Sequence, residues 1–370
     1  MNDMKDKNPK ARILALYLPQ FHPIPENDEW WGKGFTEWTN VGKAKPLFPG
    51  HDQPRVPTDL GYYDLRLPEA REAQAQMARE AGVEGFVYWH YWFGNGKELL
   101  ERPFKEVLSS GKPDFPFALA WANHTWSNKQ LGMKEAKDFI VQEYPGDEDH
   151  IAHFYSILPA LKDKRYITCD GKPIFMLFHP DYVPNSAHFV KLWQKLAKEN
   201  GLPGIYFIAL ENGYFTIQQG LEYKNEMEAD GYSAVAYMRL HTEKDGFWRK
   251  MLYRFTHYIL RWPNIYSYKR ISKTFSNDTD RIENAFPMLI PNWDHTPRSG
   301  RKGFCFVGAT PELFQKHVHE TLERVKDKPF DKRIVFIKSW NEWAEGNYME
   351  PDMTYGTGYL DALREEVFSE

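Results

Sequence analysis

Cysteine is nearly absent from this chain of 370 residues, which contains only Cys169 and Cys305. Two cysteines so far apart form neither a disulfide framework nor a Cys-x-x-Cys motif. The first ten residues lack the apolar core of a signal peptide, and no run approaches the length of about 18 apolar residues that indicates a membrane span. We therefore expect a cytoplasmic protein in which residues 1–10 have no fixed structure.

An excess of charge of either sign is also missing, since 47 basic and 51 acidic residues give a net charge of −4. Binding to nucleic acid is therefore not expected. There is no Gly-rich phosphate loop between a strand and a helix, and no Gly-x-Ser-x-Gly elbow. The close histidine pair of a zinc hydrolase is missing as well. We predict an enzyme that uses no metal and no cofactor.

Aromatic residues, by contrast, are abundant. They make up 16% of the chain and include 13 Trp and 21 Tyr, about double what we expect of an ordinary soluble domain. Flat rings with a polar edge suit the apolar faces of sugars, which makes an oligo- or polysaccharide the first ligand to consider. The alternative is that the rings fill a large core.

Eight apolar runs predict buried parallel strands, at residues 12–21, 83–92, 116–122, 173–178, 205–210, 230–237, 286–291 and 334–338. Helical patterns are found near residues 68–81, 98–110, 147–161, 186–200, 245–262, 311–326 and 358–368. Strands and helices alternate without a repeat or a low-complexity linker. The sequence therefore predicts one domain over residues 1–370, a (β/α)8 TIM barrel of the α/β class with long βα loops.

The longest loop, from His22 to about residue 67, contains Trp30, Trp31 and Trp38, and we expect it to form a lid or wall over the site. Most strands end in polar or aromatic residues, where barrels of this type place their active sites. The substrate-binding residues that we predict are His22, Trp38, Trp89, Tyr91, Trp121, Asn123, His124, Trp126, His179, Glu211, Tyr237, Asn292, Trp293, Asp294, Trp340 and Asn341.

Residues 245–262 form a basic amphipathic pattern. The apolar side chains Phe247, Met251, Phe255, Tyr258 and Trp262 share one helical face, and Arg249, Lys250, Arg254 and Arg261 lie elsewhere. We expect an outer helix that packs this face on the barrel, because any barrel helix is amphipathic. The alternative is a weak contact with a membrane surface or a lipid-linked glycan. The sequence leaves the oligomeric state open.

The motif at residues 339–346, Ser-Trp-Asn-Glu-Trp-Ala-Glu-Gly, follows directly on the last apolar run and places Glu342 and Glu345 three residues apart among aromatic rings. Two carboxyls in a partly dry cleft can divide the acid and base roles of glycoside chemistry. We predict that this pair is catalytic. The alternative is a solvated pair of glutamates in a loop that caps a helix.

Two further hypotheses remain. In a nucleotide-sugar glycosyltransferase, an Asp-x-Asp motif often holds the metal-bound diphosphate, and Asp278-Thr279-Asp280 has that spelling, although no apolar strand precedes it. In a non-catalytic glycan-binding barrel, Trp38, Trp126 and Trp293 would serve as platforms for sugar rings.

Four motifs together resemble the WbsX family. They are residues 16–23 (Leu-Tyr-Leu-Pro-Gln-Phe-His-Pro), 34–41 (Gly-Phe-Thr-Glu-Trp-Thr-Asn-Val), 121–126 (Trp-Ala-Asn-His-Thr-Trp) and 339–346. That family is similar to glycoside hydrolase family 99, the endo-α-mannosidases and endo-α-mannanases. The likeness to WbsX spans nearly the whole chain, whereas the likeness to family 99 depends mainly on the last motif and the barrel.

The resemblance implies a metal-independent, retaining glycoside hydrolase or transglycosylase that acts on an α-linked glycan of a surface polysaccharide. It implies that Glu342 deprotonates the sugar's own 2-hydroxyl, which attacks the anomeric carbon and gives a 1,2-anhydro intermediate. Glu345 then protonates the leaving oxygen and activates water, and we expect its pKa to be raised and to set the upper limb of a bell-shaped pH profile.

The family pattern differs from this sequence at one position, since family 99 usually has His where Ala344 stands. WbsX members occur in surface-polysaccharide gene clusters and are often described as glycosyltransferases. The alternative function is therefore that of a glycosyltransferase in the biosynthesis of O-antigen (lipopolysaccharide) or capsular polysaccharide.

Overall fold

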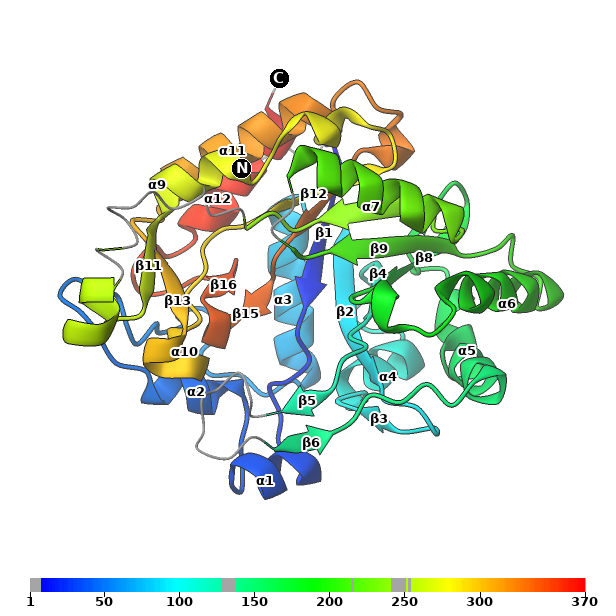
Figure 1. Ribbon diagram of the computed structural model, residues 1–370, viewed down its shortest axis with the longest axis horizontal. Helices are drawn as coiled ribbons and strands as arrows, with labels where there is room; N and C mark the ends of the chain where they lie inside the picture. The colour runs from blue at the N-terminus through cyan, green and yellow to red at the C-terminus, as the bar shows by residue number, and fades with distance from the viewer. Residues whose placement is uncertain (1–7, 128–136, 214–215, 241–250, 252–253, 370) are drawn as a thin grey trace.

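The computed structural model of the protein describes residues 8–127, 137–213, 216–240, 251 and 254–369. Its centre is a closed barrel of parallel strands (Figure 1). In sequence order these are β1 (Arg12–Tyr17), β2 (Gly85–Trp92), β4 (Phe117–Trp121), β8 (Lys172–Leu177), β9 (Tyr206–Glu211), β10 (Ala234–Tyr237), β12 (Ala285–Leu289) and β14 (Ile334–Ile337). The spatial order is β1-β14-β12-β10-β9-β8-β4-β2, and pairing of β1 with β2 closes the barrel. The predicted (β/α)8 fold is confirmed.

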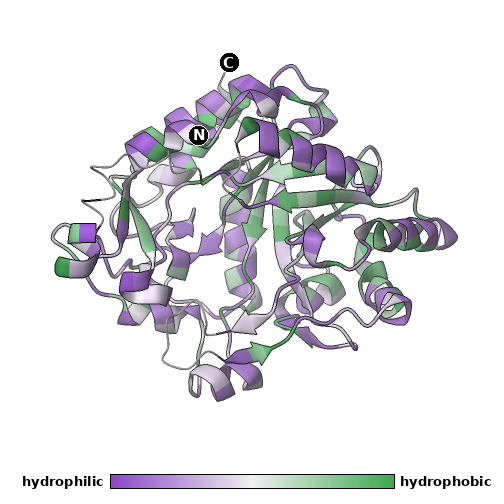
Figure 2. Cartoon of the chain, viewed as in Figure 1, coloured by the Kyte–Doolittle hydropathy of each residue, from purple (hydrophilic) through white to green (hydrophobic). Residues whose placement is uncertain are grey.

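The barrel strands are buried along their length. Every residue of β1, β2, β9 and β12 is buried, and Figure 2 shows the strands as mainly hydrophobic between helices of mixed character. Strands covered on both faces read as continuous apolar runs rather than as alternating ones. That is why each of the eight could be located in the sequence.

Six outer helices lie within the patterns that the sequence predicted. They are α3 (Pro68–Glu80), α4 (Arg102–Ser110), α5 (Asp147–Leu161), α6 (Ser186–Glu199), α11 (Pro311–Val325) and α12 (Gly358–Phe368). The helix α7 (Ile217–Ala229) was not predicted. Its signal in the sequence was a capping box. The Thr216 side chain accepts a hydrogen bond from the Gln219 backbone N–H, and the Gln219 side chain accepts one from the Thr216 backbone N–H.

The long loop after β1 contains two short helices, α1 (Pro25–Trp31) and α2 (Glu37–Lys43). Trp38 in α2 packs on Trp343 of the 339–346 motif, with ring centroids 5.5 Å apart, and Trp30 stacks on Phe139 at 5.1 Å. The loop therefore forms a wall beside the motif.

Smaller pairs of strands lie outside the barrel. They are β5 (Trp126–Ser127) with β6 (Asp138–Ile140), β11 (Asn264–Ser267) with β13 (Phe304–Val307), and β15 (Asn341–Glu342) with β16 (Asn347–Tyr348). The strand β3 (Glu98–Leu99) pairs with β2, and β7 (Thr168–Cys169) pairs with β8. The short helix α9 (Tyr268–Ile271) follows β11 and α10 (Thr296–Ser299) precedes β13.

The predicted helix at 245–262 falls partly outside the described residues, which here are Met251 and those from Arg254 on. Phe255–Ile259 form a π-helical turn, η3, whose apolar side chains are exposed. The expectation that this face packs on the barrel is therefore wrong for the described part. Trp262 does find a partner, the ring of Phe48, at 5.7 Å.

Of the N-terminal residues expected to lack fixed structure, 1–7 lie outside the described ones. Lys10 belongs to the fold, because its backbone N–H donates to the carbonyl of Val367 at 3.0 Å. Among the described helices, none combines the length and the apolar character that crossing a membrane requires.

A substitution at Gly85, at the start of β2, would test how closely β2 approaches the backbone that precedes β4. A Cβ at this position would lie 2.5 Å from the carbonyl oxygen of Pro116, a backbone atom that cannot swing away. Changing Gly85→Ala should lower the free energy of unfolding by about 1–3 kcal/mol, as overpacking does, measured by urea denaturation. Gly42→Ala, in α2 with open space around it, is the control and should be neutral or slightly stabilising. Equal stability of the two variants would contradict the predicted clash.

Candidate active site

The 339–346 motif folds back on itself at the carboxyl end of β14. Asn341–Glu342 form β15, Trp343–Glu345 form a 3-10 turn, and Asn347–Tyr348 return as β16. Gly346 joins them with a φ of 65°, and a Cβ there would lie 2.8 Å from Asp294. Glycine is required at this position for both reasons. The turn brings Glu342 and Glu345 to the same side, where Glu342 is buried and the Glu345 side chain is 13% exposed.

One ammonium group bridges the two acids. Lys338 Nζ lies 2.5 Å from Glu342 Oε1 and 3.6 Å from Glu345 Oε2. The indole N–H of Trp89 donates to the same Glu342 oxygen at 3.1 Å. The rings of Trp89 and Trp293 flank the ammonium, with centroids 5.8 and 5.4 Å away. Lys338 is thus held by two carboxylates and two aromatic faces, which replace the water that a buried cation loses.

A second cation holds Glu345 from another side. Arg298, in α10, donates through Nη1 to Glu345 Oε1 and through Nε to Glu37 Oε2 at 3.2 Å. His295 Nε2 lies 3.7 Å from the same Glu345 oxygen. The cluster therefore draws on three stretches of sequence, the loop after β1, the loop after β12 and the motif itself.

The two acids differ in their affinity for a proton. Burial and the negative charge of Glu345 raise the pKa of Glu342 to about 7, against the pull of Lys338. Burial also opposes ionisation of Glu345, but Arg298 and Lys338 together hold its pKa well below the usual value. The expectation of a raised Glu345 pKa is therefore wrong, because Arg298 was not foreseen. Glu342 shares a side-chain hydrogen bond with Glu345, and the pair takes up its first proton on Glu342 as the pH falls through about 7.

Four of the predicted substrate-binding residues surround this cluster. Trp89 and Trp293 touch Lys338. Burial raises the pKa of Tyr91, and the charge of Glu342 adds to the effect. Burial and His179 lower the pKa of His124 to about 4, against the attraction of Glu345. Both residues therefore lie within electrostatic reach of the acids.

Several polar atoms near the cluster lack hydrogen-bond partners among the described residues. They are Nδ2 and Oδ1 of Asn292, Nε1 of Trp293 and Nδ1 of His124. Asn292 and Trp293 are almost fully buried. Buried polar groups normally find partners, and an unpaired one is costly. Their hydrogen-bonding capacity is therefore unused within the described part of the chain.

Six other predicted residues are engaged with the protein itself. Indole N–H groups donate to backbone carbonyls, from Trp121 to Trp92 at 2.8 Å and from Trp38 to Tyr63 at 2.7 Å. The amides of Asn123 and Asn341 clamp the backbones of His179 and Leu18, and the Tyr237 hydroxyl donates to Gly220. Trp340 is fully buried beside Phe86. These six side chains position the loops around the cluster.

Four predicted residues make no direct contact with the acid pair in the described part of the chain. The charged neighbours of His22 are Asp64, Arg66 and Arg102. His179 stacks on Tyr182 with centroids 4.3 Å apart, and Trp126 packs between Trp30 and Tyr91. Glu211 accepts from the Gly213 N–H, and burial raises its pKa to about 7.

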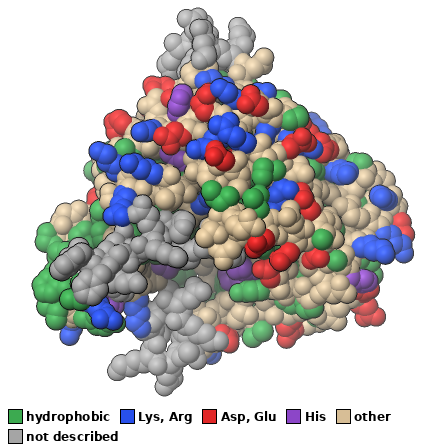
Figure 3. Space-filling view, turned by 45° about the horizontal axis from the view of Figure 1, so that its top comes forward, with side chains coloured by type: hydrophobic (Ala, Val, Ile, Leu, Met, Phe, Trp, Pro, Cys, Tyr) green, Lys and Arg blue, Asp and Glu red, His purple; other side chains and the backbone are tan. Residues whose placement is uncertain are grey.

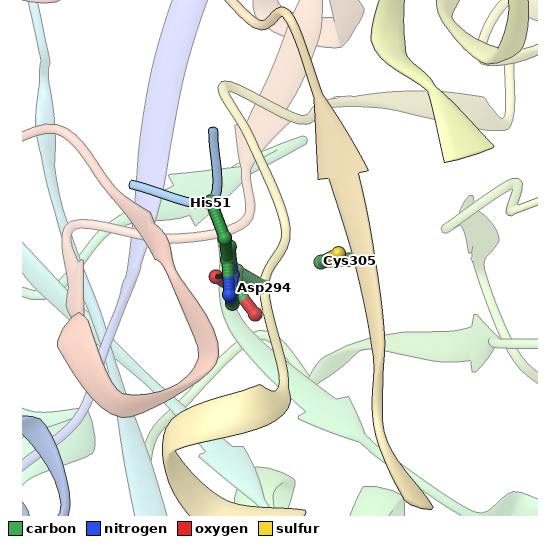
Figure 4. A group of neighbouring side chains, drawn as sticks. All are labelled: His51, Asp294 and Cys305. Atoms are coloured by element: carbon green, nitrogen blue, oxygen red, sulfur yellow. Dashed lines mark hydrogen bonds and ion pairs between the residues drawn. The ribbon is translucent and has the colours of Figure 1, made fainter. Parts of the chain in front are cut away.

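Asp294 lies in a group with His51 and Cys305 that has metal-ligand spacing (Figure 4). His51 Nδ1 accepts from the Leu47 N–H, so Nε2 carries the proton and donates to Asp294 at 2.8 Å. Asp294 also accepts from Gln53 and twice from Thr296. Burial raises the pKa of the Cys305 thiol, which opposes the thiolate that a metal needs. The group fits a structural clamp and does not fit a metal centre.

The carboxylates of the Asp278-Thr279-Asp280 motif do not come together in one site. Asp280 is fully buried and accepts from Arg239 at 2.6 Å and from the backbone of Asn277 at 2.9 Å. Asp278 is exposed and pairs with Arg324 at 2.7 Å. The two carboxylates therefore face different partners.

Sequence reasoning missed Lys338, Arg298, Glu37 and His295 as site residues. Lys338 had a signal, since it is a charge directly after the apolar run of β14. Glu37 lay within one of the family-like motifs. Arg298 and His295 follow β12 in a polar loop that carries no local mark, and only the fold brings them to Glu345.

Comparison with known proteins gives a match to the family model described as "Glycosyltransferase WbsX" over residues 13–363. Two curated relatives, each called "Uncharacterized protein WxcX", come from two strains of Xanthomonas campestris pv. campestris, and both are 33% identical to this chain over 361 residues. The match covers 96% of this chain and 50% of each relative. The chain thus spans about half the length of the curated relatives it matches.

Solved structures share the fold at low sequence identity. A "Glycoside hydrolase-like protein" superposes with a TM-score of 0.57 and 16% identity, over 100% of this chain and 97% of that one. The GH99 endo-alpha-mannosidase from Bacteroides thetaiotaomicron gives TM-scores of 0.57 with bound BIS-TRIS-propane and 0.55 without it, at 14% identity and 96% coverage of both chains. At such identity these structures show the barrel fold alone.

Removing the bridging ammonium tests the electrostatics of the cluster. In Lys338→Met the positive charge that stabilises both carboxylates is lost, so the pKa of Glu342 should rise from about 7 by roughly one unit or more. Carboxyl 13C NMR of glutamate-labelled protein, assigned with Glu342→Gln, measures this change. Lys332→Met removes a lysine that pairs with Asp170 and Glu283 and serves as the control. An unchanged titration in Lys338→Met would contradict the bridge.

Proposed function

The chain belongs to the WbsX family, and on that premise we propose that it is a carbohydrate-active enzyme whose reaction centre is Glu342 and Glu345. More specifically, we propose a retaining glycoside hydrolase or transglycosylase that acts on an α-linked glycan of a surface polysaccharide. The observation that carries the proposal is the pair of adjacent carboxyls held by Lys338 and Arg298 at the carboxyl end of β14. Family and fold together support a glycan-active enzyme.

The charge state of the pair suits glycoside chemistry. Cleavage of a glycosidic bond needs one carboxyl that can give a proton and one that can take a proton or stabilise positive charge. Burial and mutual repulsion raise the pKa of Glu342 to about 7, so that the pair can take up one proton close to neutral pH. The unpartnered groups of Asn292, Trp293 and His124 are suited to sugar hydroxyls, and the rings of Trp89 and Trp293 to the apolar faces of a sugar.

In this proposal Arg298 determines whether Glu342 or Glu345 carries the proton when the reaction begins. In the free site it pairs with Glu345, so the proton rests on Glu342. When a glycan oxygen enters beside Glu345, we propose that it displaces Arg298 toward its second partner, Glu37. Loss of the ion pair raises the pKa of Glu345, and the proton passes to it from Glu342 through the hydrogen bond that joins them. Glu342 is then the base and Glu345 the acid.

The first chemical step breaks the glycosidic bond. Glu342 takes the proton of the sugar's 2-hydroxyl, and that oxygen attacks the anomeric carbon. The bond from this carbon to the leaving oxygen breaks, and the leaving oxygen receives the proton of Glu345. The products are a 1,2-anhydro sugar, a protonated Glu342 and an ionised Glu345.

The second step opens the anhydro ring. Glu345 takes a proton from an incoming hydroxyl, whose oxygen attacks the anomeric carbon as the carbon–O2 bond breaks, and Glu342 returns its proton to O2. The configuration is inverted twice and therefore retained. Water as the acceptor gives hydrolysis and a sugar hydroxyl gives transfer, so one site serves both proposed activities.

Substituting either acid should stop turnover. Glu342→Gln and Glu345→Gln should each lower kcat/KM on α-mannan oligosaccharides by about a hundredfold or more. The loss in Glu345→Gln should be smallest on an aryl α-glycoside, whose leaving group needs little protonation. Steady-state kinetics measure both effects, and the wild-type pH profile should be bell-shaped, with an upper limb near the Glu342 pKa of about 7.

The control is Glu84→Gln, whose carboxylate pairs with Arg12 outside the cluster. It should retain wild-type rates. If either cluster variant kept full activity on a glycan that the wild-type enzyme cleaves, the assignment of that acid would be wrong.

The description of the matching family favours a second candidate, a nucleotide-sugar glycosyltransferase. Thermal denaturation with a panel of UDP-, GDP- and dTDP-sugars, with and without Mn²⁺, distinguishes the two. A retaining glycosidase should show no metal-dependent rise in Tm, because Asp278 and Asp280 face different partners. A rise that needs both the nucleotide diphosphate and Mn²⁺ would favour the transferase.

A further inference from the structure

A group of large apolar side chains is exposed around the turn η3. It consists of Met251, Phe255, Tyr258, Ile259 and Leu260, and we call these five residues the η3 patch. Tyr258 is 71% exposed and Ile259 68%. Figure 3 shows hydrophobic side chains gathered at the left edge of the face drawn there, where η3 lies in Figure 1. Single exposed apolar side chains are normal, but a contiguous group of them usually marks an interaction surface.

The charged residues along the segment that carries the η3 patch are all basic. Arg254, which lies between Met251 and Phe255, and Arg261, which follows Leu260, are exposed, and the sequence from Met251 to Ile271 contains four Lys or Arg residues and no Asp or Glu. The exposed Lys43 and Lys45 precede Phe48, whose ring contacts Trp262. A second copy of the chain on this surface would bring like charges together. A partner with an anionic surface and an apolar layer beneath it would match both the basic residues and the exposed apolar side chains.

The η3 patch is also connected to the reaction centre. Phe48 stacks on His51 with centroids 4.4 Å apart, and His51 donates to Asp294 at 2.8 Å. The backbone N–H of Asp294 in turn donates to the carbonyl of Glu345 at 2.6 Å. Because Phe48 contacts Trp262, two residues after the patch, these contacts link the segment that carries the patch to the end of the barrel where the acids lie.

We propose that the η3 patch docks on the surface of an anionic lipid bilayer, with its apolar side chains in the interfacial region and Arg254 and Arg261 at the headgroups. Such docking places the acid-bearing end of the barrel beside the membrane. If the proposed function holds, the substrate presented there is a glycan linked to a lipid. The docking itself does not depend on that function.

Vesicle co-sedimentation of the whole chain tests the docking. We expect binding to phosphatidylcholine vesicles that contain phosphatidylglycerol, weaker binding as salt rises, and little binding to phosphatidylcholine alone. Phe255→Ser with Ile259→Ser should weaken binding at least tenfold, because both side chains would leave the bilayer. Arg254→Gln and Arg261→Gln should each weaken it about fivefold, and only on the anionic vesicles.

The matched control is Leu67→Ser with Ile217→Ser, two side chains exposed by 54% and 52% outside the patch, which should bind as wild type does. Circular dichroism and Tm establish that each variant folds. Activity on a soluble glycan should be the same in the η3 variants as in wild type, so that loss of docking is distinguished from loss of function.

Three results would overturn the proposal. The first is an absence of binding to anionic vesicles at low salt. The second is equal weakening in the control variant. The third is a wild-type dimer in light scattering that Phe255→Ser with Ile259→Ser converts to monomer, which would assign the η3 patch to a contact between copies of the chain.

Discussion

The arrangement of the candidate site depends on one buried cation, Lys338. Its ammonium touches Glu342 and lies near Glu345, and the rings of Trp89 and Trp293 flank it. Two carboxylates this close in a dry site repel each other strongly, and either can ionise only if positive charge is present. Lys338 supplies part of that charge and Arg298 the rest. The cluster of Glu37, Glu342 and Glu345 with these two cations is neutral when it holds one proton.

Much of the surrounding structure fixes the geometry of this cluster. Asn341 exchanges hydrogen bonds with the backbone of Leu18 and so ties the motif to the end of β1. The Asp294 carboxylate is hydrogen-bonded to His51, and Gly346 packs closely against the Asp294 backbone. The Asp294 N–H donates to the carbonyl oxygen of Glu345. These residues act through position and not through contact with a reacting atom. They explain why so many polar side chains at the strand ends are already occupied within the protein.

The proposed roles of the acid pair and of the η3 patch are compatible with a single orientation of the molecule on a membrane. A barrel enzyme opens at the carboxyl end of its strands, and Trp262, two residues after the patch, is linked to that end through Phe48 and His51. If both proposals hold, the enzyme works on glycans held at a membrane. In the proposed mechanism the acceptor in the second step decides between hydrolysis and transfer, and the same two acids serve both reactions.

The sequence alone determined the barrel, because strands buried on both faces must be apolar along their length and could be counted. It also determined that Glu342 and Glu345 lie together, since they are three residues apart in one motif. It did not predict α7, whose pattern was weak, or the exposure of η3, because amphipathicity does not say what covers an apolar face. Nor could it decide which acid holds the proton. That depends on Arg298, which is distant in sequence, and electrostatic interactions depend on distance in space, which only the tertiary structure determines.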